Sequence, residues 1–211
     1  DQKRKSGEPY FMHPIAVTHI LADMGADGDT LVAALLHDTV EDTDLTLKQI
    51  DKQFDGGVAS LIDGVTKLEP EDVADKPTLD DQIETLRKMF SLLEQDVRVM
   101  IIKLADRLHN MQTIEHLSED RQKLMAQETL DVFVKLAYRL SMLDVCDELE
   151  GMCIAVLHPQ LHKELIGIQE KNESIGTKAM KRIETRLKTE FSPLLKKIDI
   201  LYEAKSWTKL Q

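Results

Sequence analysis

Apolar side chains recur along this sequence at the three- and four-residue spacing of amphipathic helices. Three such stripes are Val17, Ile20, Leu21 and Met24; Leu31, Ala34 and Leu35; and Leu79, Ile83, Leu86, Phe90 and Leu93. No segment alternates polar and apolar residues as a half-buried strand does. Glycine and proline fall between the stripes, where they favour turns. The pattern therefore predicts an all-α protein.

The segment 97–111 is apolar on nearly every side at its start, as a central buried helix is. Further helices are expected up to about Leu157. Beyond them, Pro193 separates two basic helices that we expect near 177–190 and 193–207, because proline fits best in a first helical turn. We therefore expect a helical domain over residues 1–157 and a helical extension or linker over residues 158–211.

The composition fits one large globular domain, or one domain with a small appendage: the chain has 211 residues, of which 42% are hydrophobic. That apolar fraction excludes global disorder. No membrane association is expected, because the apolar runs are far shorter than the roughly 20 residues that span a bilayer. Cys146 and Cys153 lie two helical turns apart, so we expect no disulfide between them and a reducing compartment.

The net charge of −11 argues against binding of duplex nucleic acid. The charge is unevenly spread. Nine of the 27 basic side chains, but only four of the 38 acidic ones, lie between Thr177 and Gln211. Because the rest of the chain is so acidic, a highly phosphorylated ligand would bind there only through metal ions and a few local cations.

The adjacent residues His37 and Asp38 are the strongest chemical signal, although such a pair is by itself more often a surface pair or a helix cap. We expect both on one helix, where neighbours diverge by about 100° and reach a common ion only near the helix surface. Further ligands must come from elsewhere, and His13 and Asp106 are the candidates. Asp106 follows apolar residues into the interior, where an unpaired carboxylate is costly. Two histidines and two aspartates suit Mn, Fe, Zn or Co.

Other polar residues extend this candidate site. Glu41 and Asp42 lie four positions after the His–Asp pair and return to the same helical face, with a solvated helix end as the alternative interpretation. Asp106, Asn110 and Thr113 form a polar stripe at i, i+4 and i+7. This spacing places the Asn110 amide and the Thr113 hydroxyl on the same side of the helix as Asp106, where they would line one wall of the site.

A compact cationic segment, Arg4-Lys5-Ser6-Gly7-Glu8-Pro9-Tyr10, stands just ahead of His13. A guanidinium beside an ammonium suits phosphate oxygens or stacking on a base. A frayed terminus is the equally weighted alternative.

Four motifs, in order, resemble the hydrolase domain of the RelA/SpoT homologue family and together cover roughly residues 4–150. They are the cationic segment with His13-Pro14, then His37-Asp38-Thr39-Val40-Glu41-Asp42-Thr43, then Asp63-Gly64-Val65-Thr66-Lys67-Leu68, and then Lys103-Leu104-Ala105-Asp106-Arg107-Leu108-His109-Asn110-Met111. The resemblance implies an HD-domain helical bundle, to which the basic C-terminal helices are an extension. The implied activity removes the 3′-pyrophosphate from guanosine tetra- or pentaphosphate (ppGpp or pppGpp), giving GDP or GTP plus pyrophosphate in stringent-response turnover.

The same resemblance implies a role for each matching residue. The implied ligands of one Mn²⁺ ion are His13, His37, Asp38 and Asp106. The implied catalytic pair beside the attacked phosphate is Glu41 and Asp42. The residues implied to contact the nucleotide are Arg4, Lys5, Ser6, Asn110 and Thr113.

The chain departs from the family pattern at three positions. Gln112 stands where an arginine is common, and Lys135 and Ser141 replace a proline and a glycine. No implied metal ligand and neither member of the acidic pair is lost, which argues against the hydrolase-dead branch. Gln112 bears instead on substrate affinity or preference.

Two alternatives stay open beside this hydrolase. One is an HD phosphohydrolase acting on another nucleotide, and the other is a nucleotide-sensing regulatory domain without turnover. The family's synthetase motifs are not recognised after Ser174, so a covalently linked synthetase domain would belong to a longer protein. We expect a cytoplasmic location, with an organelle such as the plastid as the alternative.

Overall fold

The computed structural model describes residues 7, 9–54, 56–67, 87, 91 and 95–191 of the chain. Every regular element among them is a helix and none is a strand, so the all-α prediction is confirmed. The elements are α1 (Met12–Asp23), α2 (Gly28–Leu36), α3 (Thr39–Asp42), α4 (Leu47–Gln53), α5 (Gly57–Thr66), α7 (Val97–Gln112), the 3₁₀ helix η1 (Ile114–His116), α8 (Glu119–Glu128), the π-helix η2 (Thr129–Phe133), α9 (Val134–Arg139), α10 (Leu143–Leu157) and α11 (Pro159–Phe191). The stripe predicted over 79–93 lies outside the described residues.

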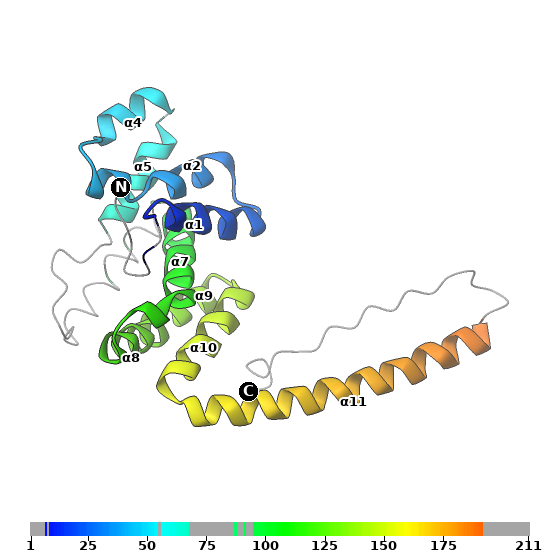
Figure 1. The fold of residues 1–211 in the computed structure, drawn as a ribbon. Coiled ribbons are helices and arrows are strands. Elements are labelled where there is room, and N and C mark those ends of the chain that lie inside the picture. The colour runs from blue at the N-terminus through cyan, green and yellow to red at the C-terminus, as the bar shows by residue number, and fades with distance from the viewer. Residues whose placement is uncertain are drawn as a thin grey trace.

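Helix α7 is the central buried helix that the sequence predicts. Met100, Ile102 and Leu104 on it have no exposed surface. Figure 1 shows α7 running between two groups of helices, with α1, α2 and α5 at one end and α8 to α10 at the other. It packs on α1, α5 and α10, and thus joins the two halves of the bundle.

The two N-terminal stripes are only partly buried. Val17 and Leu21 of α1 are fully buried, but Met24 follows the end of the helix and is 38% exposed. On α2, Ala34 is buried whereas Leu35 is 43% exposed, so the predicted face was wrong by one position. The buried face of α2 consists of Thr30, Ala33 and Ala34, and His37 follows directly after the end of the helix.

Arg98 connects the N-termini of two helices that carry the candidate site. Asp27 caps α2 by accepting from the Thr30 N–H, and Asp96 caps α7 by accepting from the Arg98 N–H. The Arg98 guanidinium donates to both carboxylates, at 3.1 Å to Asp27 and 2.7 Å to Asp96. These contacts connect the N-terminal ends of α2 and α7.

Gly64 brings α5 close to α7, and its replacement should destabilise the protein. A Cβ atom there would lie 2.7 Å from Cγ2 of Val99. We expect Gly64→Ala to lower the free energy of unfolding by about 1–3 kcal/mol, the usual cost of overpacking a core. Gly151 in α10 has open space around it, so Gly151→Ala should instead raise stability by up to about 1 kcal/mol through helix propensity. Urea unfolding of both variants checks this pair, and equal stabilities would contradict it.

Ser141 shows why a glycine is common at its position. Its φ of 59° lies in the left-handed region, where it ends α9 while the Met142 N–H donates to the Ala137 carbonyl at 2.9 Å. This backbone conformation costs a residue with a Cβ atom roughly 1–2 kcal/mol of conformational energy, and it costs glycine nothing. Ser141→Gly should therefore raise the free energy of unfolding by about 1 kcal/mol, and Ser141→Ala should not. A thermal-unfolding midpoint unchanged by Ser141→Gly would count against this account.

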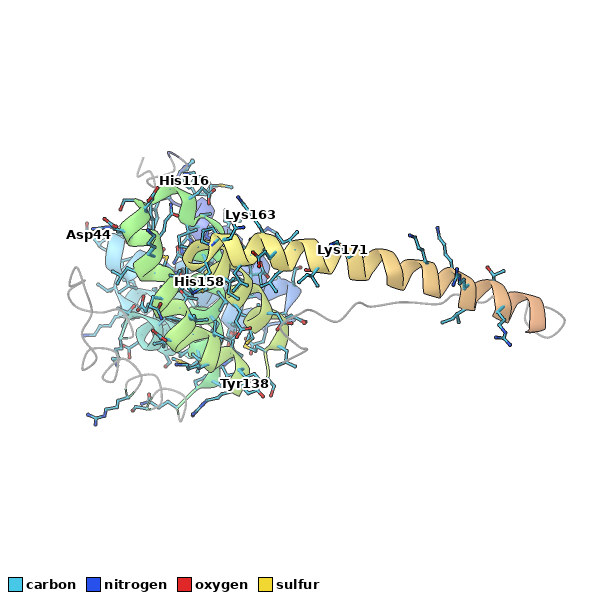
Figure 2. The ribbon with its side chains drawn as sticks, turned by 90° about the horizontal axis from the view of Figure 1, so that it is seen from below. Asp44, His116, Tyr138, His158, Lys163 and Lys171 are labelled. Carbon is cyan, nitrogen blue, oxygen red and sulfur yellow. The ribbon has the colours of Figure 1, made fainter. Side chains whose placement is uncertain are left out.

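The C-terminal part begins with one long helix, α11, which ends at Phe191, just before the break predicted at Pro193. The helix expected at 177–190 is the second half of α11, which begins at Pro159 and has 33 residues. Pro159 favours a new first turn and disfavours helix at His158, which explains the break after α10. Figures 1 and 2 both show α11 extending beyond the bundle. The helix expected at 193–207 lies outside the described residues.

The structure confirms that the two cysteines are not joined by a disulfide. Cys146 and Cys153 are buried on α10 and neither forms a disulfide. Burial raises the pKa of the Cys146 thiol to about 11 and that of Cys153 to about 12, so both are unreactive thiols. Among the described helices, none combines the length and the apolar character that crossing a membrane requires.

Candidate metal centre

His37 and Asp38 do not lie on one helix, as the sequence had predicted, but in the turn between two. Helix α2 ends at Leu36, and α3 begins at Thr39. Side chains take backbone carbonyls at this point: His37 Nδ1 lies 2.7 Å from the Ala34 carbonyl oxygen, and the Thr39 hydroxyl donates to the Leu36 carbonyl. Such local hydrogen bonds compete with helix continuation. The turn brings the two side chains together, with His37 Nε2 only 2.8 Å from Asp38 Oδ1.

His13 and Asp106 join this pair from two other helices. His13 is the second residue of α1, and Asp106 lies in the middle of α7. His13 Nε2 is 3.0 Å from Asp106 Oδ1, and the rings of His13 and His37 have centroids 5.8 Å apart. Both rings are only 4% exposed. The four residues that the sequence singled out therefore lie in one cluster, in which His13 connects Asp106 to the pair His37 and Asp38.

Asp106 is held by two further side chains of its own helix. Asn110 donates from Nδ2 to Asp106 Oδ1 at 2.8 Å, and the Lys103 ammonium lies 3.3 Å from Oδ2. Lys103 is itself 7% exposed, which is rare for lysine. The sequence reasoning did not identify Lys103, although its position three residues before Asp106 in an apolar helix is the signal that pairs them.

The local charges keep both carboxylates ionised. Burial opposes charge on Asp38, but the hydrogen bond from His37 and the nearby histidines outweigh it and lower the Asp38 pKa. Burial likewise opposes charge on Asp106, where Lys103 and the hydrogen bond from His13 hold the pKa well below its usual range. Burial disfavours the protonated form of His37, but the hydrogen bond to Asp38 and the negative charge of Asp38 outweigh this effect and raise the His37 pKa. Two ionised carboxylates are what a cation requires.

The donor atoms present fit a divalent metal ion. One donor atom each from His13, His37 and Asp38 lies within 4.8 Å of the others. Asp38 Oδ2 is buried and has no hydrogen-bond partner in the described part of the protein, and such an atom is costly unless something binds it. Nitrogen and oxygen donors together favour a transition metal over calcium. A cation bound among these residues would satisfy the orphaned oxygen.

The other predicted site residues are placed less completely. Glu41 and Asp42 lie on the short helix α3 directly after the His–Asp turn, not one turn along the same helix as predicted. Asn110 is bonded to Asp106, and the Thr113 hydroxyl donates to the His109 carbonyl at the end of α7. Arg4, Lys5 and Ser6 lie outside the described residues.

The three departures from the motif pattern lie away from this cluster. Gln112 is exposed, and its amide donates to Glu148 of α10 at 2.8 Å, so it connects two helices. Lys135 is exposed on α9, where its ammonium lies 3.9 Å from Asp131. Neither side chain contacts the four clustered residues.

The sequence is similar to those of known proteins. Residues 1–143 match the family described as HD domain. The GTP pyrophosphokinase of Streptomyces coelicolor is 47% identical over 165 residues, which cover 78% of this chain and 19% of that protein. The GTP pyrophosphokinase rsh of Brucella ovis is 41% identical over 194 residues, covering 90% of this chain and 25% of that protein. The chain thus spans about a fifth to a quarter of the length of these relatives.

A solved structure has a similar fold. The crystal structure of lmo0812 from Listeria monocytogenes is 25% identical and covers 72% of this chain and 99% of that one, with a TM-score of 0.52.

Proposed function

Because this chain belongs to the HD domain family and, within it, to the RelA/SpoT homologues, we propose that it is a manganese-dependent hydrolase of guanosine polyphosphates. It takes the tetra- or pentaphosphate (ppGpp or pppGpp), adds water across the bond between the 3′ oxygen and the pyrophosphate, and releases GDP or GTP plus pyrophosphate. The relatives carry names that refer to pyrophosphokinase activity. Because the chain spans so little of their length, that activity is not assigned to this chain.

One observation supports the proposal above all. His13, His37, Asp38 and Asp106 come from three distant stretches of sequence and meet in a buried cluster with one unsatisfied carboxylate oxygen. We propose these four residues as ligands of one Mn²⁺ ion. Such an ion, when bound, lowers the pKa of water and stabilises negative charge on a phosphoryl oxygen.

The remaining chemistry falls to residues of the chain. We assign Glu41 and Asp42 to the proton transfers: one takes the proton of the attacking water, and the other assists the departing 3′ oxygen. Their place on α3, three and four residues after Asp38, supports this assignment. Arg4, Lys5 and Ser6 bind phosphate oxygens, and Asn110 and Thr113 face the nucleotide from the end of α7.

We propose that the hydrolase domain ends near Leu157 and that residues 158–211 are an extension toward further domains of a longer polypeptide, a synthetase domain among them. The break between α10 and α11 at His158 supports this boundary. We propose a cytoplasmic location, with an organelle such as the plastid as the alternative.

Release of pyrophosphate from guanosine tetraphosphate, followed with and without Mn²⁺, tests the proposal. We expect turnover with Mn²⁺ and none after chelation. Nucleotide binding without turnover would indicate a sensing domain instead. Turnover of a different nucleotide, with the tetraphosphate left intact, would indicate a hydrolase of another substrate.

A further inference from the structure

His109 contacts a proposed metal ligand although it belongs to none of the groups assigned above. Its Nδ1 lies 2.7 Å from Nδ1 of His13, and the two rings have centroids 4.8 Å apart. His109 follows Asp106 by three residues on α7, so both residues lie on the face of that helix that meets α1. Helix α7 therefore contacts His13 at both of its ring nitrogens.

A histidine that binds a metal through one ring nitrogen needs its proton on the other. His37 meets this requirement through the backbone. Its Nδ1 lies 2.7 Å from the Ala34 carbonyl oxygen, which only accepts, so Nδ1 carries a proton, and in the neutral ring that a metal ion requires Nε2 is the nitrogen with the lone pair. Nε2 is the nitrogen that lies beside Asp38.

His13 faces the same requirement with a different partner. Its Nε2 lies beside Asp106 in the cluster, so Nε2 is the nitrogen that would bind the ion. The proton must then lie on Nδ1, and the only orientation of the hydrogen bond that allows this has His13 donating to His109. Nδ1 of His109 must accept, which leaves the proton of His109 on its Nε2.

We propose that His109 is a positioning residue that determines which ring nitrogen of His13 carries the proton. With the proton held on Nδ1, Nε2 of His13 presents its lone pair to the metal. The inference rests on the metal centre proposed above and adds to it a role for a fifth side chain. It also predicts that the two ligand histidines are oriented by different devices, a carbonyl for His37 and a second imidazole for His13.

Titration calorimetry with Mn²⁺ alone, on the full chain, tests this role with three variants. His109→Phe keeps a ring but has no acceptor, and should weaken Mn²⁺ binding by about 10–100-fold, the usual cost of losing such a partner. His109→Asn places an amide oxygen where Nδ1 was and should restore most of the affinity. His116→Phe makes the same change at an exposed ring outside the cluster and should bind like the wild type.

Nitrogen NMR of the protein loaded with Zn²⁺, which is diamagnetic, supplies an independent readout. We expect a protonated Nδ1 on His13 in the wild type and in His109→Asn. Wild-type affinity in a folded His109→Phe, a failure of His109→Asn to restore binding, or a proton on Nε2 of His13 would overturn the inference while leaving the metal centre intact. A wild-type protein that binds neither ion would overturn the proposed function, and this inference with it.

Discussion

Replacing Asp38 by alanine is expected to abolish Mn²⁺ binding and hydrolysis together. Asp38 Oδ1 lies beside His37, and its buried Oδ2 has no partner in the described part of the protein, so both oxygens are directed at the cluster and one is free for the ion. A catalytic ion supplies several kcal/mol of transition-state stabilisation, and about 4 kcal/mol corresponds to roughly a thousandfold in rate. Calorimetry with Mn²⁺ and a pyrophosphate-release assay measure the two losses.

The same variant should not unfold the metal-free protein. Alanine removes a buried oxygen that is otherwise unsatisfied, and His37 can stay neutral once its partner is gone, so no charge is left buried and unpaired. We expect an unfolding free energy within about 1 kcal/mol of the wild type. Asp44 is an exposed acid six residues on, labelled in Figure 2, and Asp44→Ala serves as the control with unchanged binding and turnover. Tight Mn²⁺ binding by Asp38→Ala would remove Asp38 from the ligand set.

Replacing Glu41 by glutamine is expected to separate metal binding from turnover. The amide has nearly the shape of the carboxylate but cannot take a proton, so the ion should bind as before while the reaction slows by about 10²–10⁴-fold, the usual contribution of a general acid or base. Comparing kcat with the calorimetric Mn²⁺ affinity checks this outcome. Asp42→Asn, measured in parallel, divides the two proton-transfer roles between the acids.

Glu115 provides the matched control for this experiment. It is an exposed glutamate on η1, away from the cluster, and Glu115→Gln should leave both affinity and kcat unchanged. Full activity of Glu41→Gln would refute the role assigned to Glu41. Loss of Mn²⁺ binding in that variant would instead place Glu41 among the ligands.

Part of the cluster could be predicted from the sequence, because burying a carboxylate is unfavourable unless another group compensates its charge. A carboxylate at Asp106 in the middle of an apolar helix must be compensated, and that need made Asp106 a candidate ligand beside His13 and the adjacent pair His37 and Asp38. The central position of α7 followed from its apolar start in the same way. Both predictions depend on burial, which hydrophobic spacing encodes well.

Local breaks were harder to predict, because they depend on single hydrogen bonds. Nothing in the apolar pattern shows that the His37 ring takes the Ala34 carbonyl and helps to end α2 at Leu36. Conversely, α11 continues through residues that the charge pattern had assigned to a separate helix, because no proline or helix-ending turn interrupts it between Pro159 and Phe191. Lys103 was missed because a lysine in a helix is usually solvated.

The length of α11 has a mechanical consequence. At 1.5 Å per residue, its 33 residues extend roughly 50 Å from the break at His158. The helix packs on α10 and extends beyond it. A change of about 10° in the angle between α11 and α10 would move the far end of α11 by roughly 9 Å. A small change in how α11 packs on α10 would therefore displace its far end by almost the width of another helix.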